Sequence, residues 1–293
     1  MISEEILKKI RRIEIISKKS SSEVFSGEYH SAFKGRGMEF SEVREYYPGD
    51  ETRFIDWNVS SRMGKIFVKQ FVEERELTVI LAVDLSSSLD FFSGQKSKKD
   101  LAAEISAIIA FTANNNKDKV GLLIFTDKVE MYIPPKRGKS HLLRIIKEIL
   151  TFRPGNRGTS IENGLTYLNK VIKKKAIIFL ISDFIDSDFS LPLRISGRKH
   201  DLIAIRIADK REIKIPDKGI FRMRDNESGE EFMVNFSSPE TRRRFREITT
   251  DKKIDLDEKF KKYNVDSIDI FSDEEYEKPL FDFFLKRRRK YSR

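Results

Sequence analysis

The most constraining feature of the sequence is a run of apolar, largely β-branched residues at 77–83 that ends abruptly at Asp84. An uninterrupted run of this kind is typical of a strand buried on both faces, as in a parallel sheet. Asp84 therefore stands at the carboxyl end of a predicted strand, where open α/β sheets bind their ligands. Ser86 and Ser88 follow it at alternate positions. The alternative is a polar turn in which Asp84 or a serine caps the next helix.

The part of the chain that follows Asp84 alternates between apolar runs and helical patterns. Further strands are predicted at 120–125, 129–133, 176–182, 202–207 and 267–271. Helices are predicted at 98–115, 140–151, 161–173, 239–263 and 274–289. This alternation predicts an α/β fold, a three-layer, doubly wound and mostly parallel sheet with helices on both faces.

The first 76 residues have a different character. Residues 2–16 predict a short amphipathic helix, and the stretch 17–76, rich in Gly, Ser and aromatic residues, predicts short strands and tight turns. We therefore divide the chain into an amino-terminal helix with a β-rich extension at 1–76 and an α/β domain at 77–293.

Four conspicuous residues lie within 53–62: Arg53, Asp56, Trp57 and Arg62. They indicate either a binding surface or a structural ion-pair cluster. We expect the extension to pack on the sheet domain and these residues to hold the junction, so that Trp57→Ala lowers stability more than metal binding.

Composition limits the class of protein. The 293 residues carry a net charge of +10, which favours anionic partners. The absence of Cys excludes disulfides and thiolate chemistry. No apolar run approaches the ~20 residues that span a bilayer, and the start of the chain lacks a signal-peptide pattern. We expect a cytoplasmic protein with at most peripheral membrane contact.

Two later loops repeat the pattern of oxygen donors at strand ends. Thr159 lies in a Gly-rich loop before a predicted helix, and Asp183 follows the apolar run at 176–182. Two carboxylates and three hydroxyls are hard donors that suit Mg²⁺ or Mn²⁺ and leave a coordination position open. The alternatives are a capping box of Thr159 with Glu162 and a turn role for Asp183. The candidate metal ligands are Asp84, Ser86, Ser88, Thr159 and Asp183.

This set resembles the metal-ion-dependent adhesion site of von Willebrand factor type A domains. The upstream sequence resembles the bacterial "domain of unknown function 58" family, in Gly35-Arg36-Gly37, Pro48-Gly49-Asp50 and Ile55-Asp56-Trp57. The resemblance implies a three-layer domain that binds Mg²⁺ through the five residues, with Asp183 acting through water. The open position then takes an Asp or Glu from a partner protein. It also implies association with a MoxR-type AAA+ ATPase, in a chaperone or assembly role without enzymatic activity.

Two other functions stay open. The charge of +10 and the six Lys or Arg residues at 286–293 are compatible with a basic surface that binds nucleic acid or an anionic membrane. No nucleic-acid-binding motif accompanies them, and a helix end carrying favourable cations is the simpler interpretation. The third function is a metal-dependent hydrolase that uses Asp84. The scattered His30, His141 and His200 give it no nucleophile–base pair.

Overall fold

A computed structural model of the chain describes residues 8, 10–16, 23–33, 38–73, 76–90, 97–186, 188–210, 218–224 and 229–291. The predicted helix at 2–16 is helical over its described residues, where Ile13 is buried. The Gly-Arg-Gly motif at 35–37 and the last two residues of the basic tail lie outside the described residues.

The centre of the molecule is a six-stranded sheet in which β3 has neighbours on both sides. The strand order is β10-β7-β6-β3-β4-β5, and every pairing is parallel except that of the edge strand β5 with β4. The strands are β3 (Thr78–Asp84), β4 (Lys119–Phe125), β5 (Val129–Lys136), β6 (Ile177–Ser182), β7 (Asp201–Ala208) and β10 (Asp266–Phe271). The predicted mostly parallel α/β sheet is confirmed.

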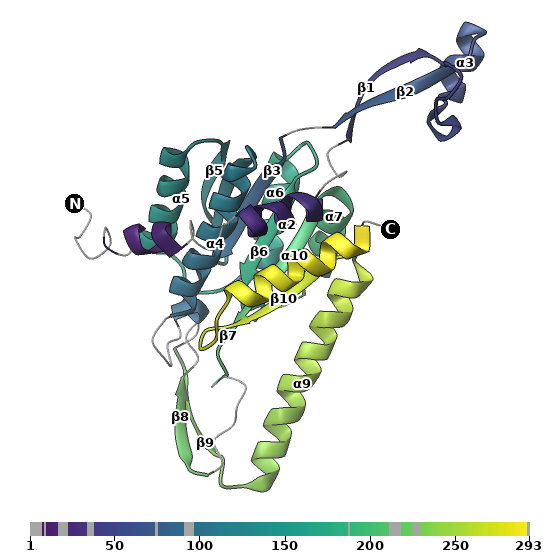
Figure 1. The fold of residues 1–293 in the computed structure, drawn as a ribbon. Coiled ribbons are helices and arrows are strands. Elements are labelled where there is room, and N and C mark those ends of the chain that lie inside the picture. Colours follow the sequence, from purple (N-terminus) through teal and green to yellow (C-terminus); the bar gives the residue numbers. More distant parts are fainter. Residues whose placement is uncertain are drawn as a thin grey trace.

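Helices cover both faces of the sheet (Figure 1). One face packs against α2 (Glu23–Phe33), α4 (Lys98–Asn115), α5 (Lys139–Thr151) and α10 (Glu277–Tyr291). The other packs against α6 (Ile161–Val171), α7 (Ser190–Lys199) and the end of α9 (Pro239–Lys262). The predicted three layers are therefore present.

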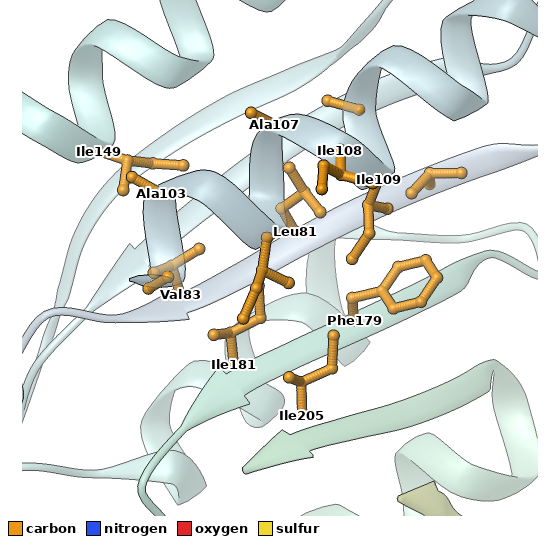
Figure 2. Close-up of a cluster of buried hydrophobic side chains, with 14 of the residues drawn as sticks. Leu81, Val83, Ala103, Ala107, Ile108, Ile109, Ile149, Phe179, Ile181 and Ile205 are labelled. Atoms are coloured by element: carbon orange, nitrogen blue, oxygen red, sulfur yellow. The ribbon is translucent and has the colours of Figure 1, made fainter. Parts of the chain in front are cut away.

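The core beneath α4 explains why the strands have continuous apolar sequences. Figure 2 shows Leu81 and Val83 of β3 beside Phe179 and Ile181 of β6, with α4 lying over them. Fourteen of the eighteen residues of α4 are buried, because the sheet, α5 and α2 all pack against this helix. Such a helix is apolar nearly all round rather than along one stripe.

Helix α2 corrects part of the sequence analysis. Residues 23–33 are helical rather than a series of strands and turns. Phe25, Tyr29 and Phe33 of this helix pack on Phe284 of α10, with ring centroids 5.3–5.9 Å apart. Although α2 precedes the proposed division at residue 76, it belongs to the core of the sheet domain. Its helical conformation depends on packing against α10, which is distant in the sequence. The local sequence pattern therefore could not predict it.

The β-rich part of the extension projects from the domain (Figure 1). It consists of β1 (Met38–Glu45), the turn η1 (Thr52–Phe54), α3 (Trp57–Met63) and β2 (Phe67–Glu73), with β1 and β2 antiparallel. The Trp57 side chain is 69% exposed, so the expectation that it holds a junction is wrong. Asp56 instead caps α3 by accepting from Asn58 N at 3.0 Å.

A second projection, the hairpin of β8 (Ile220–Arg224) and β9 (Glu231–Asn235), lies beside the start of α9. It follows the carboxyl end of β7, whereas β2 leads into the amino end of β3. The two projections therefore leave the sheet at opposite ends of its parallel strands, which we call the amino edge and the carboxyl edge. Within the described residues, no helix has the length and apolar character needed to cross a membrane.

Candidate metal centre

The candidate site lies at the carboxyl ends of the two central strands. Asp84 is the last residue of β3, and Asp183 follows Ser182, the last residue of β6. Because β3 and β6 are parallel and paired in register, with Val83 opposite Ile181, their last residues emerge side by side. The fold thus brings two carboxylates from distant parts of the sequence to one edge.

Asp84 is held in one orientation by two hydrogen bonds. Its side chain is fully buried, its Oδ1 accepts from Ser86 N at 2.8 Å, and its Oδ2 accepts from Ser182 Oγ at 2.7 Å. The alternative that Asp84 or a following serine caps the next long helix is wrong, because Ser97 caps α4. Ser182 is a supporting residue that sequence analysis did not single out.

The turn after Asp84 brings the two predicted hydroxyl ligands together. Ser86 Oγ and Ser88 Oγ lie 2.9 Å apart, and both residues are buried. Because the 3-10 turn η2 (Ser87–Asp90) curls the chain, hydroxyls at alternate positions face each other. A carboxylate and two hydroxyls thus converge on one small region.

Thr159 is half-buried in a loop that is tied to this turn. Ser87 N and Ser87 Oγ both donate to the carbonyl oxygen of Arg157, at 3.0 and 2.8 Å. The capping-box alternative for Thr159 is wrong, because Ser160 caps α6 by accepting from Asn163 N. The loop thus lies against the turn that carries Ser86 and Ser88.

A further hydrogen bond joins this loop region to the one after β6. Asp186 Oδ2 accepts from Ile161 N, the first residue of α6, at 2.7 Å. Three segments, the turn after β3, the loop before α6 and the segment after β6, are therefore bonded to one another before any ligand binds. Such preorganisation is what a binding site requires.

The second carboxylate has a partner that sequence analysis missed. Lys98 Nζ lies 3.1 Å from Asp183 Oδ2, and neither side chain is more than 3% exposed. Asp183 Oδ1 accepts from Ile185 N at 3.3 Å, so the predicted turn role of Asp183 is present as well. Lys98 stands in a charged first turn with Lys99 and Asp100, a pattern that ordinarily indicates a solvated helix end, so the sequence carried no signal for this pair.

The electrostatics of Asp84 differ from those of an ordinary aspartate. Burial, and then the negative charge of Asp183, raise the pKa of Asp84 to about 7, although hydrogen bonds from Ser182 and Ser86 oppose the shift. A bound cation would favour the ionised carboxylate and would therefore lower the pKa of Asp84. Without one, the site holds a carboxylate that is costly to ionise.

The donor chemistry fits a hard divalent cation better than a soft one. All five predicted ligands offer oxygen, and a carboxylate such as that of Asp84 has about four lone-pair sites, more than the hydrogen bonds from Ser182 and Ser86 use. No group of three or more His, Cys, Asp or Glu side chains that could hold a metal occurs in the described part of the chain. An ion here would depend on hydroxyls and water, as Mg²⁺ sites often do.

Residues 42–255 of the chain match the family described as "Protein of unknown function DUF58". The chain belongs to this family. Over 285 residues it is 28% identical to the uncharacterized protein Rv1480 of Mycobacterium tuberculosis, with 96% of this chain and 89% of that protein covered.

Two solved structures are similar to part of this chain. An aerotolerance-related membrane protein from Bacteroides fragilis matches with a TM-score of 0.48 and 14% identity, covering 73% of this chain and 99% of that one. The SpRpn10 VWA domain matches with a TM-score of 0.38 and 12% identity, covering 72% of this chain and 94% of that one.

Proposed function

We propose that this chain is a protein-binding module that depends on Mg²⁺ or Mn²⁺ and has no catalytic activity of its own. The observation that carries the proposal is the convergence of buried Asp84 with the Ser86 and Ser88 hydroxyls at the ligand-binding edge of the sheet. Asp183 adds a second carboxylate, and Thr159 a third hydroxyl in the adjoining loop.

In this proposal the partner completes the site. A divalent cation held by few charged ligands keeps a position for an outside oxygen, which an Asp or Glu of a partner protein supplies. The contact is directional and charge-assisted, since the ion is the largest local charge. The partner class implied by the family resemblance is a MoxR-type AAA+ ATPase, with this chain as its adaptor or co-chaperone in protein assembly or maturation.

The test is binding to the purified MoxR-type ATPase of the source organism, measured with Mg²⁺ and then with EDTA. Asp84→Asn keeps the shape of the side chain but removes its charge. Asp118→Asn is the matched control, because Asp118 is also buried but accepts from Leu77 N at the amino edge of the sheet. We expect Mg²⁺-dependent binding that Asp84→Asn weakens by at least about tenfold, or about 1.4 kcal/mol, and that the control retains. Equal binding in EDTA, or by Asp84→Asn, would contradict the proposal.

The positions of the histidines argue against the hydrolase. His200 immediately precedes β7 and its Nδ1 accepts from Ala176 N, while the His141 ring bonds the carbonyl oxygen of Val120 near the start of β4. Both therefore lie toward the amino edge, away from Asp84. His30 is exposed on α2.

The basic-surface alternative loses much of its support in the carboxyl-terminal helix. Arg287 is buried in ion pairs, Arg288 Nη1 lies 2.5 Å from Glu28 Oε1, and Lys290 Nζ lies 3.2 Å from Asp266 Oδ1. Arg287 is thereby withdrawn from the surface, and the charges of Arg288 and Lys290, which stay 41% and 54% exposed, are partly balanced by these carboxylates. Saturable binding to DNA, RNA or anionic vesicles at moderate salt would favour the alternative.

A further inference from the structure

Lys98 is an unusual residue at the candidate site because its ammonium group lies inside the protein. Its side chain has no solvent exposure, and its Nζ lies 3.1 Å from Asp183 Oδ2. Removing a charge from water is unfavourable unless a partner of opposite charge compensates. Asp183 supplies such a partner for this cation.

The position of Lys98 within its helix is also unfavourable. Ser97 caps α4 by accepting from Asp100 N at 3.0 Å, so Lys98 is the first residue of the helix. The amino end of a helix carries partial positive charge and favours anions rather than cations. Neither helix electrostatics nor solvation accounts for a lysine here, which leaves the carboxylates at the strand ends as the reason.

A charge count shows what the lysine changes. Ionised Asp84 and Asp183 contribute two negative charges, and Lys98 reduces the net charge to −1. A divalent cation then brings the centre to +1, and one carboxylate from a ligand brings it to zero. Without the lysine, the ion alone would neutralise the centre, and a carboxylate ligand would leave it negative. In a buried site of low dielectric constant, such differences in net charge are costly.

We propose that Lys98 is a built-in cation of this site that makes binding of the divalent ion and binding of an acidic ligand depend on each other. The ion alone binds weakly because it adds positive charge beside the ammonium group. A carboxylate strengthens its binding because it removes the excess charge, and by linkage the ion strengthens binding of the carboxylate equally. This inference rests on the proposed metal-dependent function.

The test is titration of Mn²⁺ into the protein. Binding is measured in two ways, by calorimetry and by the electron paramagnetic resonance signal of the free ion. Lys98→Met keeps length and apolar volume but removes the charge, and Lys98→Arg retains it. Lys99→Met is the matched control, because Lys99 is the next residue of the helix but donates to the Phe152 carbonyl oxygen at 2.6 Å. Each protein is titrated with and without acetate, which serves as the carboxylate probe.

We expect Lys98→Met to bind Mn²⁺ alone at least about tenfold more tightly than the wild type. We expect Lys98→Arg and Lys99→Met to bind it as weakly as the wild type does. Acetate should tighten Mn²⁺ binding by the wild type several-fold more than binding by Lys98→Met.

The possible results separate the two proposals. Wild-type binding as tight as that of Lys98→Met, with the same effect of acetate, would overturn the role of Lys98 and leave the metal site standing. Absence of Mn²⁺ binding in every protein would overturn both. Lys98→Gln, which can still donate to Asp183, is the second neutral variant if Lys98→Met does not fold, and the same results are expected of it.

Discussion

Two largely buried clusters of charge lie at opposite edges of the same sheet, and each contains two aspartates on neighbouring strands and a cation from a helix that pairs with one or both of them. At the amino edge, Asp201 and Asp266 begin β7 and β10, and Arg287 of α10 pairs with both. At the carboxyl edge, Asp84 and Asp183 follow β3 and β6, and Lys98 of α4 pairs with Asp183. The comparison separates a structural cluster from a candidate binding site.

In the amino-edge cluster both carboxylates pair directly with cations. Arg287 Nη1 donates to Asp266 Oδ2 at 2.6 Å, and Nη2 donates to Asp201. The Cζ atom of Arg287 lies 4.8 Å from the centroid of the Phe33 ring. Lys290 adds a second cation to Asp266. Two cations therefore meet two carboxylates, and the planar fork of arginine fixes their geometry.

In the carboxyl-edge cluster, by comparison, the hydrogen bonds to Asp84 come from neutral groups. Asp84 accepts from two neutral groups, Ser86 N and Ser182 Oγ, and the Ser86 and Ser88 hydroxyls lie beside it. Burial and the negative charge of Asp183 disfavour the ionised form of Asp84, which raises its pKa. The same composition, two aspartates and a basic residue, thus gives direct ion pairs to both carboxylates at one edge, and at the other a buried carboxylate that we propose holds a further cation.

The largest expected effect is on stability at the amino edge. Arg287→Met leaves the buried carboxylate of Asp201 unpaired, so we expect the free energy of unfolding to fall by about 3–5 kcal/mol. Urea unfolding followed by circular dichroism measures this loss. Exposed Arg289→Met is the control and should change stability by less than about 0.5 kcal/mol. If the two variants lose equal stability, the amino-edge cluster is not structural.

The next effect concerns the pH dependence of the metal-free protein. The pKa of Asp84 is about 7 in the folded chain, against about 3.9 in an unfolded one. Between these values the folded chain retains a proton that the unfolded chain has lost, so the free energy of unfolding falls as the pH rises. The loss amounts to a few kcal/mol, at about 1.4 kcal/mol per pKa unit.

The measurement is urea unfolding at pH 5 and pH 8 for the wild type and for Asp84→Asn, both in EDTA. The variant has no titrating group at this position, so the fall in stability from pH 5 to pH 8 should be smaller in it. Mg²⁺ should restore much of the wild-type stability at pH 8, because it binds the ionised form. Equal falls in both proteins would contradict the electrostatic difference between the edges.

The smallest effect is expected in the projecting arm. Since Trp57 is 69% exposed, Trp57→Ala should change the free energy of unfolding by less than about 0.5 kcal/mol and leave metal binding unchanged. Phe33→Ala, at a buried aromatic contact with Phe284, should cost about 3–5 kcal/mol. Thermal and urea unfolding test both. A large loss from Trp57→Ala would show that the arm packs on another part of the chain.

Much of this fold follows from local sequence patterns. The apolar run before Asp84 and the helix at Lys98–Asn115 were predictable because their periodicity reports burial directly. The parallel order of β3 and β6 also brings Asp84 and Asp183 together at one edge, as the alternation of strands and helices implied.

What sequence could not supply depends on contacts between distant residues. Lys98 pairs with a residue 85 positions away, and nothing near it in the sequence distinguishes it from a solvated lysine. The helical conformation of residues 23–33 depends on α10, near the other end of the chain. The exposure of Trp57 likewise depends on where the arm projects, because an aromatic residue among charges reads equally as core or surface.

The most direct test of the central claim is calorimetric titration of Mg²⁺ and Mn²⁺ into the wild type and Asp84→Ala, in acetate so that a carboxylate is available. The account predicts saturable binding at one site in the wild type and none in the variant. Absence of saturable binding in the wild type, or equal binding in Asp84→Ala, would show that the Asp-x-Ser-x-Ser turn is a structural element rather than a metal centre.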